Sequence, residues 1–256
     1  MIHTVPLANK PLCMVEYQTE LFIGYARGRI LKLSDSFLSP KCIAEASGPV
    51  STIFFVNGKL HYGTWDGILY TQNKEIKLGL NPIKCGCFFN QKIFISIDNK
   101  LIILNEEFKI LEKIELESKI FCMDVYSDKI VFGMSNGDVR TFTESLEKNC
   151  SNNHTMSILC IRNELTGSTD GSLRKNGDVI FESQNWVRSI FSEDLFSSGK
   201  DVFISGKYAY SHKDEVVGTT KIHDTIISIG LDYCYKIFEN EIRLTAEEEN
   251  ELLSML

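Results

Sequence analysis

The sequence predicts an all-β protein, a single ring of seven four-stranded sheets known as a β-propeller. Three observations support this prediction. A unit of three or four short apolar runs separated by polar turns recurs seven times. Within each unit, apolar and polar residues alternate with the period of two that is typical of strands. A small residue also recurs near the end of the second run, with successive separations of 39, 33, 37, 34, 32 and 31 residues, at Gly24, Gly63, Ser96, Gly133, Gly167, Gly199 and Gly230.

Each unit is expected to open with a first strand, followed by a tight turn such as Asn57-Gly58-Lys59. Asn-Gly is a strong hairpin signal because both residues tolerate positive φ. The first strands are predicted at 12–17, 50–56, 83–89, 120–126, 157–162, 186–191 and 215–221. Weaker fourth strands are predicted at 41–44, 75–78, 111–116, 178–182 and 241–244.

A helical repeat of about 33–34 residues has a similar period, but the alternation and the Gly and Asp turns favour strands. A single blade would expose two apolar faces, and stacking around a ring buries both. Such a ring usually closes through a blade built from both ends of the chain. Residues 2–7 are therefore expected to add an outer strand to the last blade. The run 101–104 is apolar throughout, as expected for a strand covered on both sides.

The propeller is expected to span residues 1–244 and to be followed by a short helix over 245–256. Thr245-Ala246-Glu247-Glu248 forms a capping box, and Leu252, Leu253, Met255 and Leu256 give the segment an apolar end. A helix of two or three turns is too short to be stable alone. It either docks on the ring or binds a partner, and the sequence leaves both alternatives open.

Composition restricts the classes of function. The chain has 256 residues, 43% of them hydrophobic, and a net charge of −7, which argues against nucleic acid as a direct partner. No apolar stretch approaches the length of a membrane span, and the N-terminus lacks the apolar core of a signal peptide. The eight cysteines are scattered, so free thiols in a reducing compartment, the cytoplasm or nucleus, are expected.

The sequence contains no motif that indicates a cofactor, a metal site or a catalytic residue. We found neither a Gly-rich phosphate loop nor a His-Glu-x-x-His helix. Cys85 and Cys87 fall on one face of a predicted strand, but no Cys-x-x-Cys pair accompanies them. Small thiols that fill the interior of a blade are the favoured interpretation.

The repeats resemble the WD-repeat family over residues 12–244. The strings that carry this resemblance are Gly63-Thr64-Trp65-Asp66-Gly67, Gly167-Ser168-Thr169-Asp170-Gly171 and the preceding His154-Thr155. The resemblance implies a stabilising network between a His before the first strand and an Asp after the second. His154 with Asp170 has both members in place, whereas His212 and His223 are poorly spaced for Asp232. We therefore expect one well-formed repeat, at 154–182, and six eroded ones.

The C-terminal half is also similar to the WD-repeat diphthine methylesterase family. The residues that carry this similarity are His154-Thr155-Met156, Thr166-Gly167-Ser168, Trp186, Arg188, Ile190 and Tyr208-Ala209-Tyr210. It implies an esterase of the diphthamide pathway as the alternative function. The chain departs from that family because it is shorter and lacks an intact Gly-Gly-Val-Trp-Arg string.

Aromatic and basic residues that are expected to be exposed indicate a function other than that of an esterase. In a propeller, Trp65 and Trp186 are expected on the same rim, with Arg27 and Arg188 at equivalent places in other blades and Tyr233 as a further rim residue. Trp and Arg are typical hot spots of protein interfaces. Packing of each Trp between blades is the alternative. The leading hypothesis is a non-enzymatic scaffold that binds proteins or peptides on this rim within a multiprotein complex.

Overall fold

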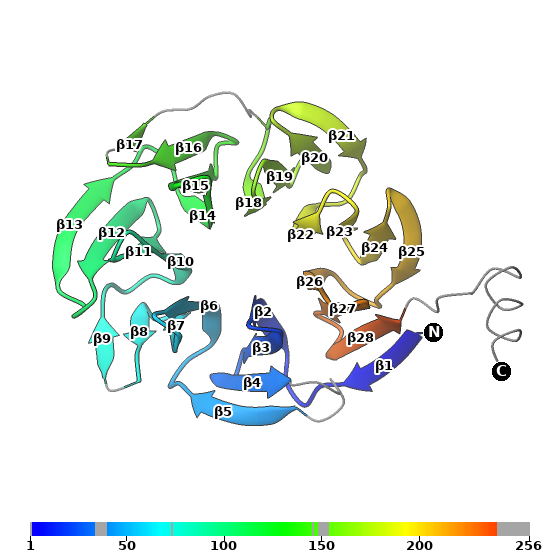
Figure 1. Ribbon diagram of the computed structural model, residues 1–256, viewed down its shortest axis with the longest axis horizontal. Helices are drawn as coiled ribbons and strands as arrows, with labels where there is room; N and C mark the ends of the chain where they lie inside the picture. The colour runs from blue at the N-terminus through cyan, green and yellow to red at the C-terminus, as the bar shows by residue number, and fades with distance from the viewer. Residues whose placement is uncertain (1, 34–39, 73, 145, 148–153, 240–256) are drawn as a thin grey trace, which may run out of the picture.

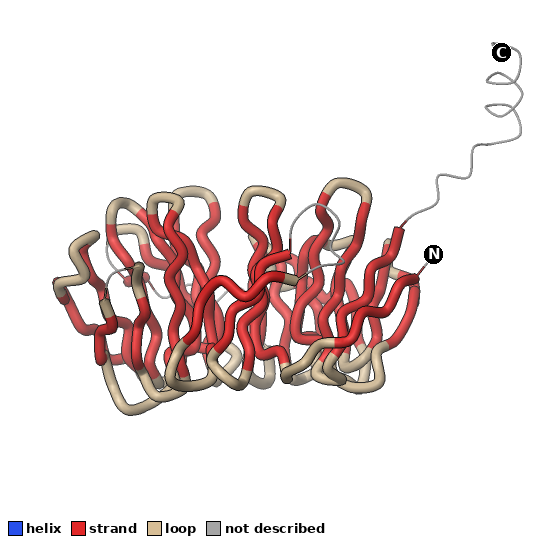
Figure 2. Tube along the Cα trace, turned by 90° about the horizontal axis from the view of Figure 1, so that it is seen from below, coloured by secondary structure: helices blue, strands red, loops and turns tan. Residues whose placement is uncertain are grey.

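The computed structural model describes residues 2–33, 40–72, 74–144, 146–147 and 154–239. Its strands form seven four-stranded antiparallel sheets arranged in a ring (Figure 1). Seen from the side, the strands connect two faces of a ring, and turns lie on both (Figure 2). This confirms the predicted all-β, seven-bladed propeller. The predicted helix over 245–256 and the predicted strand at 241–244 lie outside the described residues.

Four successive strands make up each of the first six blades. Blades 1 and 2 contain β2 (Pro11–Tyr17), β3 (Glu20–Tyr25), β4 (Arg29–Leu33), β5 (Lys41–Glu45), β6 (Val50–Val56), β7 (Lys59–Thr64), β8 (Ile68–Tyr70) and β9 (Glu75–Lys77). Blades 3 and 4 contain β10 (Ile83–Phe89), β11 (Lys92–Ile97), β12 (Lys100–Asn105), β13 (Ile110–Glu115), β14 (Ile120–Tyr126), β15 (Lys129–Met134), β16 (Val139–Phe142) and β17 (Leu146–Glu147). Blades 5 and 6 contain β18 (Ile158–Arg162), β19 (Leu165–Ser168), β20 (Ser172–Lys175), β21 (Asp178–Glu182), β22 (Val187–Ser192), β23 (Leu195–Ser198), β24 (Asp201–Ile204) and β25 (Lys207–Ser211).

Blade 7 combines the first strand of the chain with the last three described strands. It consists of β26 (Val216–Ile222), β27 (Thr225–Gly230), β28 (Cys234–Glu239) and, on its outer edge, β1 (Ile2–Pro6). β1 lies beside β28 (Figure 1), and the two strands pair from Ile2 opposite Phe238 to Pro6 opposite Cys234. The predicted closure by the N-terminal residues is therefore confirmed.

The first strands lie within one residue of their predicted bounds, and so do the four predicted fourth strands that fall in the described residues. The sequence pattern missed the fourth strands β17 and β25. The hydrophobic core lies between the blades, and one cluster joins Phe94 and Leu101 of blade 3 to Ile120 and Phe132 of blade 4. Residues 101–104 are all at most 3% exposed, as predicted for a covered strand. Burial of these faces drives adjacent blades together.

One β-bulge recurs in all seven blades. The pairing of each first strand with its second strand skips the second residue, which is Leu12, Ser51, Lys84, Phe121, Leu159, Arg188 or Val217. The next residue then faces the small residue of the second strand, for example Cys13 opposite Gly24 and Cys160 opposite Gly167. Because the bulge lies at the same place in every repeat, the seven blades share one register. A β-bulge of this kind can redirect the side chains next to it.

This register corrects two of the predicted small residues. In blades 6 and 7 the equivalent positions are Ser197 and Ile229, rather than Gly199 and Gly230. A small residue usually occupies this position because space is limited. A Cβ at Gly24, for example, would lie 2.6 Å from Cys13 Sγ and 2.7 Å from a methyl group of Val50 in the next blade. In blade 7 the opposing residue is Gly218, which leaves room for a large side chain.

The strand order defines two faces. Among the described residues, the loops between blades and the turns between second and third strands lie on one face, which we call the rim face. The described turns between first and second strands, and between third and fourth strands, lie on the opposite face. Among the described residues there is no helix long and apolar enough to span a membrane.

Candidate functional site

The five predicted partner-binding residues all lie on the rim face. Arg27, Trp65 and Tyr233 occupy turns between second and third strands in blades 1, 2 and 7. Trp186 directly precedes the first strand of blade 6, and Arg188 is the bulged residue of that same strand. Blades 6, 7, 1 and 2 are consecutive around the closed ring (Figure 1). We call these five residues the rim arc.

The aromatic residues of the rim arc face solvent. Trp65, Trp186 and Tyr233 are 49%, 45% and 50% exposed. Arg27 is also exposed, whereas Arg188 is half-buried and its guanidinium lies 2.5 Å from a Glu215 carboxylate oxygen. Half-exposed tryptophans do not fit the alternative in which each is packed between blades. Their exposed surface is available for contact with another molecule.

Tyr233 has an unusual backbone for its residue type. Its φ is 60°, in the left-handed region. The equivalent turn residues in blades 1, 2, 4 and 5 are glycines with φ between 74° and 86°: Gly28, Gly67, Gly137 and Gly171. A non-glycine residue in this conformation costs roughly 1–2 kcal/mol. Tyr233 thus holds an exposed aromatic ring in a turn where four other blades have glycine.

A cavity of about 300 Å³ lies beside Trp186 at the boundary of blades 6 and 7. Its wall carries both charges, from Lys200, Lys213, Asp214 and Glu215. A cavity of this size can receive one or a few polar side chains of a partner. The Trp186 ring next to it would add an apolar contact, a combination typical of interface anchors.

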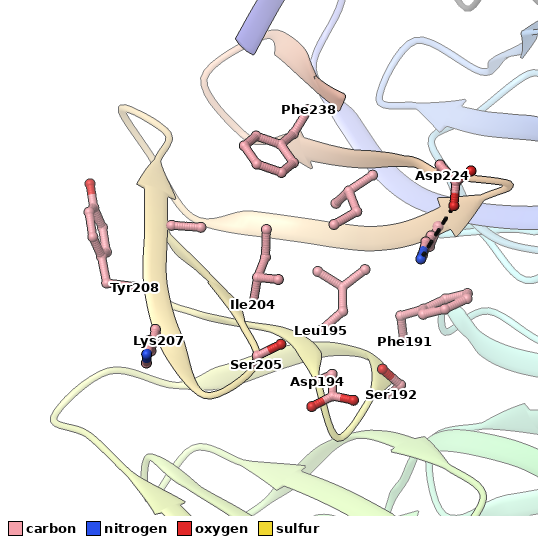
Figure 3. A pocket seen from close by; sticks show the side chains of 13 residues that line it. Phe191, Ser192, Asp194, Leu195, Ile204, Ser205, Lys207, Tyr208, Asp224 and Phe238 are labelled. Carbon is pink, nitrogen blue, oxygen red and sulfur yellow. Dashed lines mark ion pairs between the residues drawn. The ribbon is translucent and has the colours of Figure 1, made fainter. Parts of the chain in front are cut away.

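A larger groove of about 520 Å³ lies between blades 6 and 7 on the opposite face (Figure 3). Leu195, Ile204 and Phe238 line its apolar part, and Tyr208 stands at its edge, 60% exposed. Lys221 and Asp224, 4.0 Å apart, also line it. No sequence motif marks this groove, because its lining residues come from several strands and turns of two blades.

In blade 5, the structure brings His154 and Asp170 together. The His154 Nδ1 lies 3.3 Å from a carboxylate oxygen of Asp170 and 2.9 Å from Ser172 Oγ, and its Nε2 lies 2.8 Å from Thr166 Oγ1. Burial lowers the pKa of His154 and by itself would raise that of Asp170. Hydrogen bonds from Ser172 and Thr155 and the charge of His154 outweigh burial and bring the pKa of Asp170 to about 2.

Blade 7 contains a second network that the sequence analysis did not expect. The His212 Nδ1 lies 3.1 Å from Asp232 Oδ1, and its Nε2 lies 2.7 Å from Ser228 Oγ. The spacing is 20 residues here and 16 in blade 5, which is why it was judged poor. The expectation of a single well-formed repeat was therefore wrong. His223, the other candidate for Asp232, lies exposed in a turn.

Both networks have the connectivity of a catalytic triad, with a hydroxyl on one ring nitrogen and a carboxylate on the other. However, Thr166 is 1% exposed and Ser228 is fully buried. The buried Tyr210 hydroxyl fills the remaining space beside Ser228, 3.0 Å from its Oγ. A substrate cannot reach either hydroxyl in this arrangement, so the geometry gives the esterase alternative no support.

Cys85 and Cys87 have packing contacts within and between blades. The Cys85 Sγ lies 2.9 Å from Ser96 Oγ in the neighbouring strand, and the Cys87 Sγ lies 3.9 Å from Met123 Sδ in the next blade. Burial raises the pKa of Cys85 to about 12 and that of Cys87 well above its ordinary value. Thiols that stay protonated in this way fill space and do not act as nucleophiles.

Comparison with known proteins supports the fold. No protein-family profile matches the sequence, and no curated protein matches it either. Among solved structures, the WD40 β-propeller domain of Doa1 has a TM-score of 0.76 at 13% identity, covering 94% of this chain and 96% of that one. U3-55K has a TM-score of 0.71 at 14% identity, covering 93% of this chain and 98% of that one. The computationally designed Ika8 protein has a TM-score of 0.63 at 13% identity, with coverage of 92% and 98%. At this level of identity the likeness concerns the fold alone: the chain has the fold of a WD40 β-propeller.

Proposed function

We propose that this protein is a non-enzymatic scaffold that binds another protein through the rim arc. The observation that carries the proposal is Tyr233, an exposed aromatic residue at a backbone position that favours glycine. Trp65 and Trp186 add exposed aromatic surface on the same face. WD40 propellers commonly act as interaction scaffolds, and the likeness of this chain to solved WD40 propellers supports the general class of function.

The proposed partner is a protein or peptide that presents apolar side chains next to charged ones. The half-exposed aromatic rings would bury apolar side chains, and the cavity beside Trp186 offers Lys200, Lys213 and Asp214 to charged ones. The seven cysteines among the described residues are free thiols, which fits the proposed cytoplasmic or nuclear location.

The proposal can be tested by affinity purification of a tagged protein under conditions that preserve complexes. We expect a stoichiometric partner, and we expect Trp186→Ala combined with Tyr233→Ala to weaken its binding by roughly 1,000-fold, because truncation of each hot-spot residue costs about 2 kcal/mol. Thermal unfolding should show that the double variant remains folded, since both side chains are about half exposed.

Tyr208→Ala is the matched control because Tyr208 is an exposed aromatic residue near the opposite face. It should leave the complex intact. The proposal fails if no partner is retained, or if Tyr208→Ala disrupts the complex while the rim variant does not. The second result would move the interface to the groove on the opposite face.

A further inference from the structure

Three potential metal ligands converge in blade 7, directly beside Tyr233. Asp232 Oδ1 lies 3.1 Å from His212 Nδ1 and 3.1 Å from Cys234 Sγ, and the nitrogen and sulfur atoms are 3.7 Å apart. In a tetrahedral zinc site, bonds of about 2.0–2.3 Å place neighbouring donor atoms roughly 3.3–3.6 Å apart. The triangle formed by these three atoms therefore has about the size of one face of such a tetrahedron.

The remaining polar atoms of the ligand side chains are already held by other partners. The His212 Nε2 lies 2.7 Å from Ser228 Oγ, and the backbone N–H of Lys213 donates to the second carboxylate oxygen of Asp232 over 2.7 Å. Partners of this kind usually orient the ligands of protein-bound zinc. They leave His212 Nδ1 and Asp232 Oδ1 directed toward the Cys234 thiol.

Blade 7 differs from blade 5 at two places that matter here. Cys234 stands where blade 5 has Ser172, two residues after the Asp in each case. Gly230 stands where blade 5 has Ser168, and a Cβ at Gly230 would collide with both Asp232 Oδ1 and His212 Nδ1. Because Gly230 has no side chain, the His212 imidazole and the Asp232 carboxylate can lie against its backbone. Cys234 adds a soft sulfur donor, which favours zinc.

We infer that blade 7 binds a zinc ion through His212, Asp232 and Cys234, whereas blade 5 has only the hydrogen-bond network. This inference departs from the sequence-based expectation of no metal site, which rested on the absence of a metal-binding motif. On binding, Cys234 releases its thiol proton and forms the zinc–sulfur bond. The imidazole keeps its proton on Nε2, toward Ser228, and a water molecule completes the tetrahedron.

The inference can be tested with Co²⁺ as a spectroscopic substitute for Zn²⁺, using the full chain with Cys42 and Cys150 replaced by serine. Cys42 is exposed and would bind metal adventitiously, and Cys150 lies outside the described residues. We expect one equivalent of Co²⁺ to produce a thiolate-to-cobalt charge-transfer band and the visible bands of tetrahedral cobalt. One equivalent of Zn²⁺ should abolish both sets of bands.

Cys234→Ser is the decisive variant because it recreates the donor set of blade 5. It should keep the fold but lose the charge-transfer band, and its Zn²⁺ affinity should fall by more than the roughly 10–100-fold that loss of an orienting partner costs. Ser172→Cys is the matched control, and it should add no second equivalent of bound metal because Ser168 keeps its side chain.

A cobalt spectrum without the charge-transfer band in the parent protein, or an unchanged band in Cys234→Ser, would overturn the inference. The readout does not depend on any partner. A failure of zinc binding therefore leaves the proposal for the rim arc unaffected, and the reverse also holds.

Discussion

Blades 5 and 7 contain the same hydrogen-bond network built on strands of different length. In blade 5, β18 and β19 have five and four residues, whereas the corresponding β26 and β27 of blade 7 have seven and six. The four additional residues account for the wider spacing between His212 and Asp232. The bulge near the start of each first strand keeps the rim end of both blades in the same register. The additional residues of blade 7 therefore lengthen its strands toward the face opposite the rim face, and the His–Asp contact stays intact.

The two networks differ in what surrounds them. In blade 5, Asp170 accepts hydrogen bonds from the backbone and hydroxyl groups of both Ser172 and Thr155. In blade 7, Asp232 accepts one backbone hydrogen bond, from Lys213, and contacts the Cys234 thiol. The blade 5 network is thus better suited to stabilising the fold. In blade 7, Asp232 accepts fewer hydrogen bonds, so its carboxylate is better able to bind a ligand.

The largest expected effect comes from removing the two carboxylates. Asp170→Ala should lower the free energy of unfolding by about 3 kcal/mol, since it leaves several buried donors without an acceptor. Asp232→Ala should cost less, about 1–2 kcal/mol in metal-free buffer, because fewer donors lose a partner. Urea unfolding measures both values. If Asp232→Ala lowered the free energy of unfolding as much as Asp170→Ala or more, the proposed difference between the two networks would be contradicted.

Substitution of the turn residue after each Asp should give the second largest difference between the two blades in the free energy of unfolding. Gly171→Ala should destabilise the protein by about 2 kcal/mol, because its φ is 82° and a Cβ there would collide with the Ser183 carbonyl. Tyr233→Gly should change the free energy of unfolding by less than about 1 kcal/mol, since relief of strain offsets the greater freedom of the unfolded chain. Urea unfolding is again the measurement. A loss above about 2 kcal/mol for Tyr233→Gly would mean that this tyrosine supports the fold.

The smallest expected effect is on the pH dependence of stability. Burial lowers the pKa of His154 in the folded protein, so the unfolded chain binds the proton more readily and stability falls as pH drops below about 6.5. Asp170 contributes in another window: its stabilisation is present above about pH 4 and is lost toward pH 2.

His154→Gln should be less stable than the parent at pH 7, and its stability should fall less between pH 7 and pH 5. The difference in slope cannot exceed about 1.4 kcal/mol per pH unit for one proton. Urea unfolding at several pH values checks this. Parallel curves for the two proteins would show that His154 does not titrate differently on folding.

The sequence predicted those features of the fold that repeat. Alternating strands, tight turns and the apolar N-terminal segment 2–7 were sufficient to predict the number of blades and the closure. Local spacing predicted less well where blades differ in length, as for His212 with Asp232, or where a small residue moves to the opposing strand, as for Ile229 with Gly218. The sequence suggested the rim residues, but the positive φ of Tyr233 and the cavity beside Trp186 depend on tertiary structure.

Hydrogen exchange measured on the purified protein, with and without its bound partner, tests the central claim most directly. If the rim arc binds the partner, amide exchange should slow in the loops at 183–186 and 212–215 and in the turns at 26–28, 65–67 and 231–233. Exchange around the groove on the opposite face, at 192–194, 205–208 and 223–225, should stay unchanged. Protection at the groove without protection of the rim arc would contradict the proposed function.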